Sequence, residues 1–414
     1  MKHQNPETHL NHGYRLSFVV ITVLFMLWGF GHSFIDVLNS HFESALHTTK
    51  AHAAWVHLMV YGGHFLIALP AGFMVRRWGY RKAMLSGLLL YALGALLFVP
   101  AEGRHHEMTL ALLSLFVVGC GLGSLEVAAN PYVAALGSEQ TAARRLNLAL
   151  AFNGLGLMAG PIVGGWALFG SNSHDEWNVF GLLSLSDVAM PYLLLGTITI
   201  IVAVVFSRLR LPEIHLEAVH SESTQKVARI WQNLLSSGRF RFGMLTLFLY
   251  VMAQTGINST FVYYATDCGI GLTHSDAARL LGGVCLLLFL IGRLAGSFVM
   301  KYVRPATLLS FAAVVAVICS VLAIFLRGHI GLGAVLMIYL CESIMYPTLF
   351  SLCISGTKEN ASIASSLLEM SVVGGAVAPM LMGYVADLSS AAQGFVLPLC
   401  CFVVILIFSR KSHA

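Results

Sequence analysis

Charged residues are scarce in this chain. Asp, Glu, Lys and Arg together make up 10% of its 414 residues, whereas a soluble domain carries about 25%. Apolar residues make up 57% of the chain. This number of charged residues is too small to cover a surface exposed to water. The composition therefore excludes a soluble globular protein. It indicates an all-α membrane protein that crosses the lipid bilayer many times.

The sequence also lacks the short motifs of several functional classes. It has no Walker A motif, no HExxH zinc motif and no nucleophile elbow. Its 8 cysteines form no CxxC pair, and most lie in apolar runs, where cysteine acts as a small packing residue. The net charge of +5 reflects basic loops. We therefore expect no enzymatic activity, no cofactor, no metal site and no nucleic-acid partner.

Long apolar runs dominate the chain instead. About 20 apolar residues suffice to cross a bilayer as a helix. Twelve candidate spans follow on this basis: Phe18–Leu38, Val56–Val75, Ala83–Pro100, Leu110–Leu136, Leu146–Phe169, Val188–Phe206, Phe242–Tyr264, Leu280–Met300, Thr307–Leu326, Ile330–Ile354, Ile363–Ala386 and Gly394–Phe408.

A polar connector separates the first six spans from the last six. We therefore divide the chain into an N-terminal six-helix half (1–206), a connector (207–240) and a C-terminal six-helix half (241–414). The part of the connector around Trp231 is expected to form a surface helix.

The basic residues predict the orientation. Most of the 24 Lys and Arg residues fall in one alternating set of loops, and such loops face the cytoplasm. Both termini and the connector are therefore expected on the cytoplasmic side of the inner, or plasma, membrane. An even number of spans agrees with this placement.

The two halves also repeat. Glu126 lies five residues before Pro131, and Glu342 lies five residues before Pro347. This match, with others at similar spacing, indicates two six-span halves related by a parallel repeat. Folds of this kind bind substrate between the halves, near the middle of the membrane.

Glu126 is the only charged residue in the run Leu110–Leu136. A carboxylate at mid-membrane depth costs about 2.5–3.5 kcal/mol on insertion scales, so it needs a partner or a proton. Asn130 lies one helical turn further on the same face, and the glycines before Glu126 permit close approach of a neighbouring helix. Intramembrane acids usually mark substrate or proton pathways. The alternative is a structural glutamate that bonds across helices.

Two further polar faces are candidates. His32, Ser33 and Asp36 share one face of the first span, although Asp36 can also be an idle acid near the helix end. Gln254 and Asn258 lie four residues apart in the seventh span. Their amides can bind sugar hydroxyl groups or can bridge helices.

Glu342 and Glu369 are the other acids within spans. For each, substrate contact and a structural role, with Arg293 as a partner, are both open. His57 and His64 lie seven residues apart in the second span and can serve a proton path or line a wet cavity.

Several segments carry a resemblance to a known family. They are Leu125–Tyr132, Arg145–Ala149, Ala253–Thr255, Ile291–Arg293 and Tyr346–Leu352. The chain resembles the major facilitator superfamily and, within it, the fucose–galactose–glucose:proton symporter family. The resemblance implies the twelve-helix major facilitator fold. It also implies that Asp36 and Glu126 couple proton and sugar, and that Asn130 contacts sugar. Tyr346 joins the substrate-binding candidates.

The sequence departs from that family in places. His32 and Ser33 stand in an asparagine-rich stretch of the family, and Glu342 and Glu369 stand where its known member has apolar residues. We therefore expect a remodelled site for L-fucose, a hexose or an N-acetylhexosamine. The expected activity is import of a monosaccharide by proton symport with alternating access, by a monomer. A drug or metabolite:proton antiporter, a sodium-coupled sugar transporter and a non-transporting sensor are the alternatives.

Overall fold

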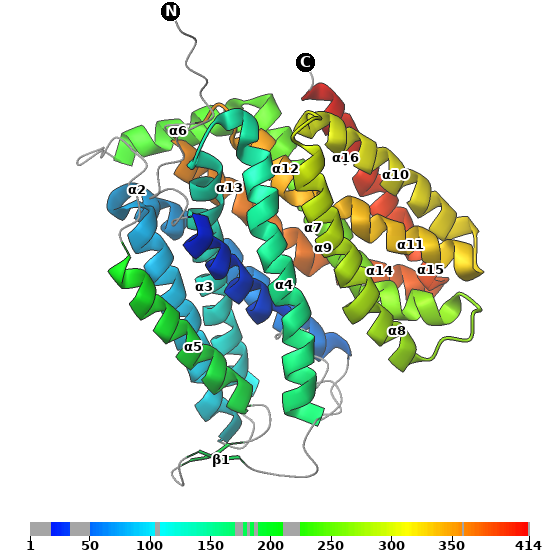
Figure 1. The fold of residues 1–414 in the computed structure, drawn as a ribbon, viewed down its shortest axis with the longest axis horizontal. Helices are drawn as coiled ribbons and strands as arrows, with labels where there is room; N and C mark the ends of the chain where they lie inside the picture. The colour runs from blue at the N-terminus through cyan, green and yellow to red at the C-terminus, as the bar shows by residue number, and fades with distance from the viewer. Residues whose placement is uncertain are drawn as a thin grey trace, which may run out of the picture.

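The computed structural model describes residues 18–33, 50–103, 108–169, 177–179, 183–185, 189–209, 224–357 and 360–412. Two groups of helices lie side by side, one from each half of the chain (Figure 1). The first contains the helix Phe18–Ser33, α2 (Lys50–Gly103), α3 (Met108–Ala135), the 3₁₀ helix η1 (Glu139–Thr141), α4 (Ala142–Phe169) and α5 (Ala189–Arg208).

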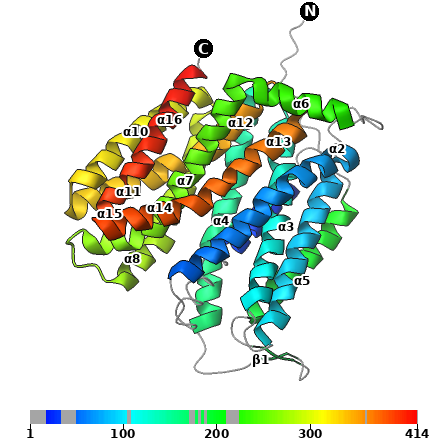
Figure 2. The ribbon, with the colours of Figure 1, turned by 180° about the vertical axis from the view of Figure 1, so that it is seen from behind.

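The second group contains the remaining long helices. They are α7 (Gly238–Asp267), α8 (His274–Leu280), the π-helical turn η2 (Leu281–Cys285), α9 (Leu286–Val299), α10 (Pro305–Phe325), α11 (Gly328–Glu342), α12 (Met345–Ile354), α13 (Ala361–Met370), the 3₁₀ turn η4 (Ser371–Val373), α14 (Gly374–Leu388), α15 (Ala391–Gly394) and α16 (Val396–Lys411). The two groups meet where α4 packs on α9 and α12, and where α13 packs on α2 and α3 (Figures 1 and 2).

The helices follow the apolar runs of the sequence. Among the described residues, 8 helical segments are long and apolar enough to cross a membrane, and the helices Phe18–Ser33 and Tyr192–Arg208 are apolar but shorter. The long segment Leu58–Pro100 holds two expected spans, which meet at a kink where Gly79 has a φ of 83°. A positive φ favours glycine, so this residue permits the turn between them. The end of the first expected span, beyond Ser33, lies outside the described residues.

Two smaller elements complete the chain. The expected surface helix is confirmed as α6 (Thr224–Ser236), which lies across the end of the molecule where α16 ends (Figure 1). The strands β1 (Trp177–Val179) and β2 (Leu183–Leu185) pair antiparallel with Asn178 opposite Ser184. The apolar runs predict only helices, so this short strand pair, which lies between two expected spans, was not predicted.

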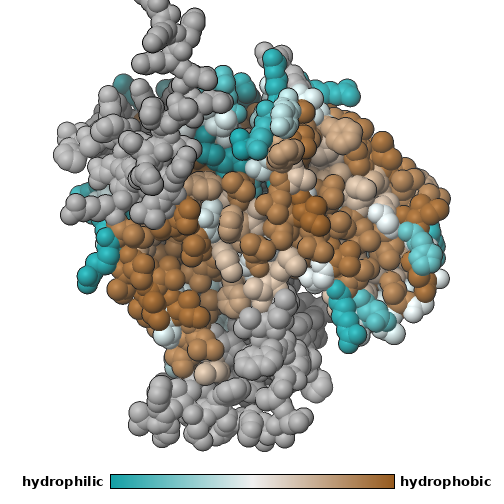
Figure 3. Space-filling model, viewed as in Figure 1, coloured by the Kyte–Doolittle hydropathy of each residue, from teal (hydrophilic) through white to brown (hydrophobic). Residues whose placement is uncertain are grey.

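The surface agrees with a membrane environment. Figure 3 shows a broad apolar band with polar residues above it and below it on the right. Large apolar side chains that are exposed include Leu66 at 59%, Ile201 at 57% and Phe311 at 66%. An apolar belt of this extent would be unstable in water, and it fits the acyl chains of a bilayer.

Glycines of α3 allow α2 to approach closely. A Cβ on Gly119 would lie 2.2 Å from the carbonyl oxygen of Val60, and one on Gly123 would lie 3.0 Å from Cα of His64. The first distance is too short for real atoms and the second is very tight, so a larger residue at Gly119 would push the two helices apart and one at Gly123 would require a shift. The close approach predicted from the glycines is confirmed, and it places His64 beside the turn that carries Glu126.

Pro131 provides a contact between the halves. It lies inside α3 and has no N–H group, so the carbonyl of Val127, four residues earlier, has no helical donor. Ser365 of α13 supplies the missing hydrogen bond, with Oγ 3.0 Å from the Val127 oxygen. A proline in one half is thus satisfied by a hydroxyl from the other.

Pro347 acts in the equivalent way in the second half, where α11 ends at Glu342 and α12 begins at Met345. The carbonyl of Ser343, four residues before Pro347, accepts a hydrogen bond from Nε of Arg293 at 3.1 Å. The break in the helix is therefore held by a buried arginine, whose remaining N–H groups are free to reach across to the other half.

The halves are joined at the end of the molecule where α16 ends. Oε1 of Glu139 accepts hydrogen bonds from Oγ of Ser355 at 2.6 Å and from the backbone N–H of Gly356 at 2.8 Å. Nearby, Oγ of Ser297 donates to the carbonyl of Arg144 at 3.2 Å. These contacts close that end of the molecule between the two groups of helices.

Candidate functional site between the two halves

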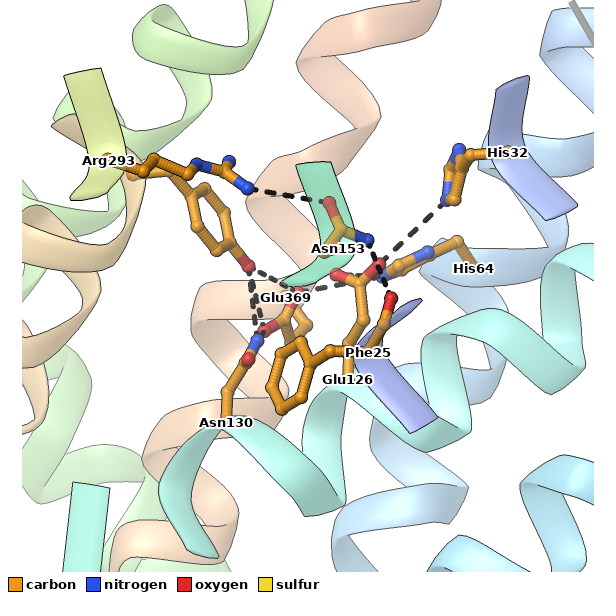
Figure 4. Close-up of polar contacts among 9 residues, drawn as sticks. Phe25, His32, His64, Glu126, Asn130, Asn153, Arg293 and Glu369 are labelled. Carbon is orange, nitrogen blue, oxygen red and sulfur yellow. Dashed lines mark hydrogen bonds and ion pairs between the residues drawn. The ribbon is translucent and has the colours of Figure 1, made fainter. Parts of the chain in front are cut away.

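Three buried ionisable side chains meet between the halves (Figure 4). Nε2 of His64, on α2, lies 3.5 Å from Oε2 of Glu126 on α3 and 3.6 Å from Oε2 of Glu369 on α13. The exposed fractions are 1% for His64, 4% for Glu126 and 0% for Glu369. One imidazole therefore lies between two carboxylates, one from each half of the chain. We call these three residues the acid–histidine cluster.

Asn130 and Tyr346 hold Glu369 in this position. Nδ2 of Asn130 donates to Oε1 of Glu369 at 2.7 Å, and the Tyr346 hydroxyl donates to either carboxylate oxygen at 2.9 Å or 3.0 Å. Asn130 also lies 3.4 Å from the Tyr346 hydroxyl. Because Asn130 comes from α3 and Tyr346 from α12, the carboxylate accepts hydrogen bonds from both halves.

The same two residues lie close to the symmetry axis of the repeat. Asn130 and Tyr346 are 216 residues apart, and so are Glu139 and Ser355, which also contact each other. A residue can contact its own equivalent in the other half only near the axis that relates the halves. The cluster and the joined end of the molecule therefore lie along one axis.

His32 borders the cluster on a more exposed side. Its Nε2 is 3.9 Å from Oε1 of Glu126, and its side chain is 26% exposed against 6% for that of Glu126. Its ring lies 6.4 Å from that of Trp28. The neighbouring Ser33 donates its hydroxyl to carbonyls of its own helix, at 3.2 Å and 3.3 Å. Asp36 lies outside the described residues.

Arg293 forms a second polar link between the halves, close to the cluster (Figure 4). Its Nη1 donates to the carbonyl of Leu150 and, at 3.4 Å, to Oδ1 of Asn153, both on α4. The suggested pairing of Arg293 with Glu369 is therefore wrong. The guanidinium is occupied by backbone carbonyls and an amide, and Glu369 takes its hydrogen bonds from Asn130 and Tyr346 instead.

Glu342 has a different environment. It is 0% exposed, and neither carboxylate oxygen has a hydrogen-bond partner in the described part of the chain. Arg293 acts on it electrostatically. Glu342 was expected to face the same interface as Glu126. No hydrogen bond or ion pair of the described residues joins Glu342 to the cluster, so no contact supports that expectation.

The amides of α7 also remain apart from the cluster. Gln254 and Asn258 are half-buried, and the buried Oδ1 of Asn258 has no hydrogen-bond partner among the described residues. An unpartnered buried carbonyl oxygen can accept a hydroxyl group from a ligand, or it can remain idle. A substrate-binding role for both residues stays a prediction.

The acid–histidine cluster suits a proton better than sodium. An imidazole nitrogen of His64 and one carboxylate oxygen each of Glu126 and Glu369 lie within 4.8 Å of one another, so all three side chains can contact one small cation. Hard cations such as Ca²⁺ and Mg²⁺ take oxygen ligands, usually six or more for Ca²⁺, whereas imidazole suits transition metals. Two carboxylates buried together also disfavour a second negative charge. The place of His64 in this cluster could not be predicted from the sequence, because hydropathy does not tell which neighbouring helix a side chain meets.

Comparison with known proteins identifies the family of the chain. A sequence profile of the Major Facilitator Superfamily matches residues 16–379. The chain belongs to the Major Facilitator Superfamily. It is 32% identical over 411 residues to a glucose/galactose transporter of Brucella abortus (strain 2308), covering 98% of this chain and 96% of the relative. It is also 32% identical over 410 residues to the L-fucose-proton symporter of Escherichia coli (strain K12), covering 96% and 93%.

Solved structures of the superfamily have the same fold. The crystal structure of a variant of the E. coli fucose:proton symporter FucP matches with a TM-score of 0.85 and 31% identity, over 97% of this chain and 99% of that chain. A second FucP structure, in the outward conformation, matches with a TM-score of 0.84. The proton:xylose symporter XylE, at 12% identity and a TM-score of 0.72, shares the fold alone.

Proposed function

We propose that this membrane protein imports a monosaccharide together with a proton, by alternating access between two helical halves. The family and the similar proteins are transporters, not enzymes. Among them are a glucose/galactose transporter and the E. coli fucose symporter, whose name gives the proton as the coupled ion. The observation that carries the proposal for this chain is the imidazole of His64 between the buried carboxylates of Glu126 and Glu369.

The cycle follows from the cost of buried charge. With the site open to water, the carboxylates can ionise, because water stabilises them. Closing the halves over the site removes that water, so closure requires a proton on one of the carboxylates. A bound sugar supplies hydroxyl groups that satisfy the remaining donors and acceptors. The loaded carrier can therefore close and reopen on the other side, while a carrier with sugar but no proton is held back.

The residue roles remain proposals. Glu126 and Asp36 couple the proton, with Asp36 nearer the outside. The substrate-binding set is Asn130, His32, Ser33, Gln254, Asn258, Glu342, Tyr346 and Glu369. Within this set Asn130, Tyr346 and Glu369 have the strongest support, because they already bind one another across the interface. Ser33 has less, because its hydroxyl proton is used by its own helix.

Orientation and domain boundaries are also proposals. Residues 1–206 and 241–414 form the two halves, and 207–240 connects them. The joined end of the molecule carries the basic residues Arg144 and Arg145, so we assign it and both termini to the cytoplasmic side of an inner membrane. A carrier closed at that end faces outward, and we propose that it works as a monomer.

A counterflow assay in proteoliposomes tests the substrate. Purified protein would exchange labelled sugar in the presence of an unlabelled panel of L-fucose, glucose, galactose and N-acetylglucosamine. The sugar that competes at the lowest concentration is the substrate. Competition by amphipathic drugs but by no sugar would favour the antiporter alternative, and no flux of any kind would favour a sensor.

The coupling ion is tested separately. Sugar added to a weakly buffered suspension should make the medium more alkaline as protons enter with it. Replacing external sodium with potassium should leave uptake unchanged. Uptake that requires sodium and leaves the external pH constant would contradict proton symport.

A further inference from the structure

Glu369 has contacts that a role in sugar binding alone does not explain. It is a fully buried acid from the C-terminal half, yet its carboxylate is bound by Asn130 and approached by His64, both from the N-terminal half. His64 in turn is 1% exposed, and neither ring nitrogen has a hydrogen-bond partner in the described part of the chain. Buried polar groups without a hydrogen-bond partner are rare in native proteins, so this imidazole needs an explanation.

We propose that the transported proton is shared by Glu126 and Glu369 through His64, so that the coupling site spans both halves of the carrier. The proposal rests on the proposed function, because it assigns the proton of that symport. In this proposal Glu369 and Glu126 both couple the proton to sugar transport, and His64 passes the proton between them.

Counting charges gives the mechanism. With a neutral imidazole and both carboxylates ionised, the cluster carries two negative charges. One proton leaves a single negative charge, and a second proton makes the cluster neutral. The low dielectric of a closed site favours the neutral state. Closure over a sugar therefore takes up one proton from water, and reopening on the other side returns that proton to water.

The geometry fits a proton that moves rather than one that is fixed. Nε2 of His64 is almost equally distant from the two carboxylates, at 3.5 Å and 3.6 Å, and both distances are longer than a formed hydrogen bond. A small approach of the halves would let a proton on Nε2 bind either carboxylate. Titratable groups near the cluster include His32, which approaches Glu126, and Tyr346, which donates to Glu369. Tyr250 lies beyond Tyr346, with 6.2 Å between the ring centroids.

His32 is the group on the path to water. Its side chain is 26% exposed and lies 3.9 Å from Glu126, whereas the three members of the cluster are almost fully buried. A proton from the aqueous side can therefore reach Glu126 past His32 and then Glu369 through His64. No charged side chain of the described residues other than those in the cluster and His32 forms an ion pair with either carboxylate.

The test measures proton uptake upon sugar binding. Purified carrier in a weakly buffered detergent solution would receive the sugar identified by counterflow, with a pH indicator present. For the wild type we expect about one proton per bound sugar near neutral pH. Glu369→Gln should bind sugar within about 10-fold of wild-type affinity, because the amide oxygen still accepts from Asn130 and Tyr346. Its proton uptake should fall below about 0.2 per sugar.

The reason for that loss separates the proposal from a single-acid mechanism. Without the carboxylate of residue 369, the cluster is neutral with one proton, which Glu126 and His64 already hold before the sugar arrives. If Glu126 or Asp36 alone carried the proton, Glu369→Gln would still take up about one proton per sugar. That result would overturn the proposal.

Two controls keep the result interpretable. Asp276→Asn removes an exposed acid that caps α8 through Thr273, and its proton uptake should equal that of the wild type. Glu369→Met removes the charge with an apolar side chain of similar size and serves if the amide variant does not fold. It should lose proton uptake as Glu369→Gln does, with weaker sugar binding because it has no oxygen to accept from Asn130 and Tyr346. Failure of the proposed function is distinct, because the wild type would then bind sugar without any proton uptake.

Discussion

The two repeat-related segments, 126–131 and 342–347, have the same local pattern and different surroundings. Each has a glutamate five residues before a proline, and each proline frees a carbonyl one turn earlier. In the first segment the freed carbonyl bonds to Ser365 of the other half, and Glu126 faces His64. In the second the freed carbonyl bonds to Arg293. Glu342 has no hydrogen-bond partner in the described part of the chain.

The difference shows which features of a site a sequence repeat reproduces in both halves and which it does not. It gives Glu126 and Glu342 equivalent positions before a proline, and it brings Asn130 and Tyr346 into contact with each other and with Glu369. It does not supply the partner of each acid. Glu126 lies next to His64 because α2 packs closely against α3 at Gly123. Among the described residues, the helices around Glu342 provide no hydrogen-bond donor to its carboxylate.

The largest effect is expected from a substitution in the first segment, at Glu126. Glu126→Gln should reduce proton-driven sugar accumulation at least about 100-fold, because an amide cannot release a proton. Counterflow should remain within about 5-fold of wild type, because the amide resembles the protonated acid. Both rates are measured in the same proteoliposomes. Full accumulation by this variant would remove Glu126 from the coupling mechanism.

The equivalent change in the second segment should affect stability instead. Glu342→Met replaces a buried carboxyl group without hydrogen bonds by an apolar side chain of similar length. We expect the free energy of unfolding to rise by about 1–3 kcal/mol, because an unsatisfied buried polar group is removed. Thermal melting of the purified protein in detergent measures the change. A lower melting temperature would show that Glu342 has a partner or ligand in the native protein.

A third substitution tests the role of Tyr346, the repeat equivalent of Asn130. Tyr346→Phe removes the hydroxyl donor to Glu369 and keeps the ring, so sugar affinity should fall about 10-fold, equal to about 1.4 kcal/mol. Proton uptake per bound sugar should stay at the wild-type value. Sugar binding by isothermal titration, with the pH indicator in parallel, measures both. Loss of proton uptake would mean that the hydroxyl itself takes part in proton transfer.

The smallest effect is expected at the joined end. Glu139→Ala removes two hydrogen bonds to Ser355 and Gly356 at an exposed site. Such contacts contribute about 0.5–1 kcal/mol net, so the inward-facing population should rise about 2- to 5-fold. Protease or thiol-reagent access from the cytoplasmic side measures that population, and Asp276→Asn is a matched exposed control. An unchanged population would show that other contacts hold this end closed.

Much of the site could be predicted from the sequence. Glu126 is conspicuous because it is alone in an apolar run, and Asn130 follows one turn later on the same face. The glycines before Glu126 correctly predicted close helix packing. His64 and Arg293 were misjudged for one physical reason. Hydropathy gives the depth of a residue along a helix and leaves open which neighbouring helix its side chain meets.

By itself the sequence determined that this is a many-spanning helical membrane protein, built as a repeat, with a few acids in apolar runs. Those properties depend on composition and spacing, which act locally. The tertiary structure decided which acids meet. Glu369 is 239 residues from Asn130 in the chain and binds it directly, while Glu342 has no such contact. Only the packing of α13 against α2 and α3 brings two carboxylates to one imidazole, because the contact joins helix faces from opposite halves.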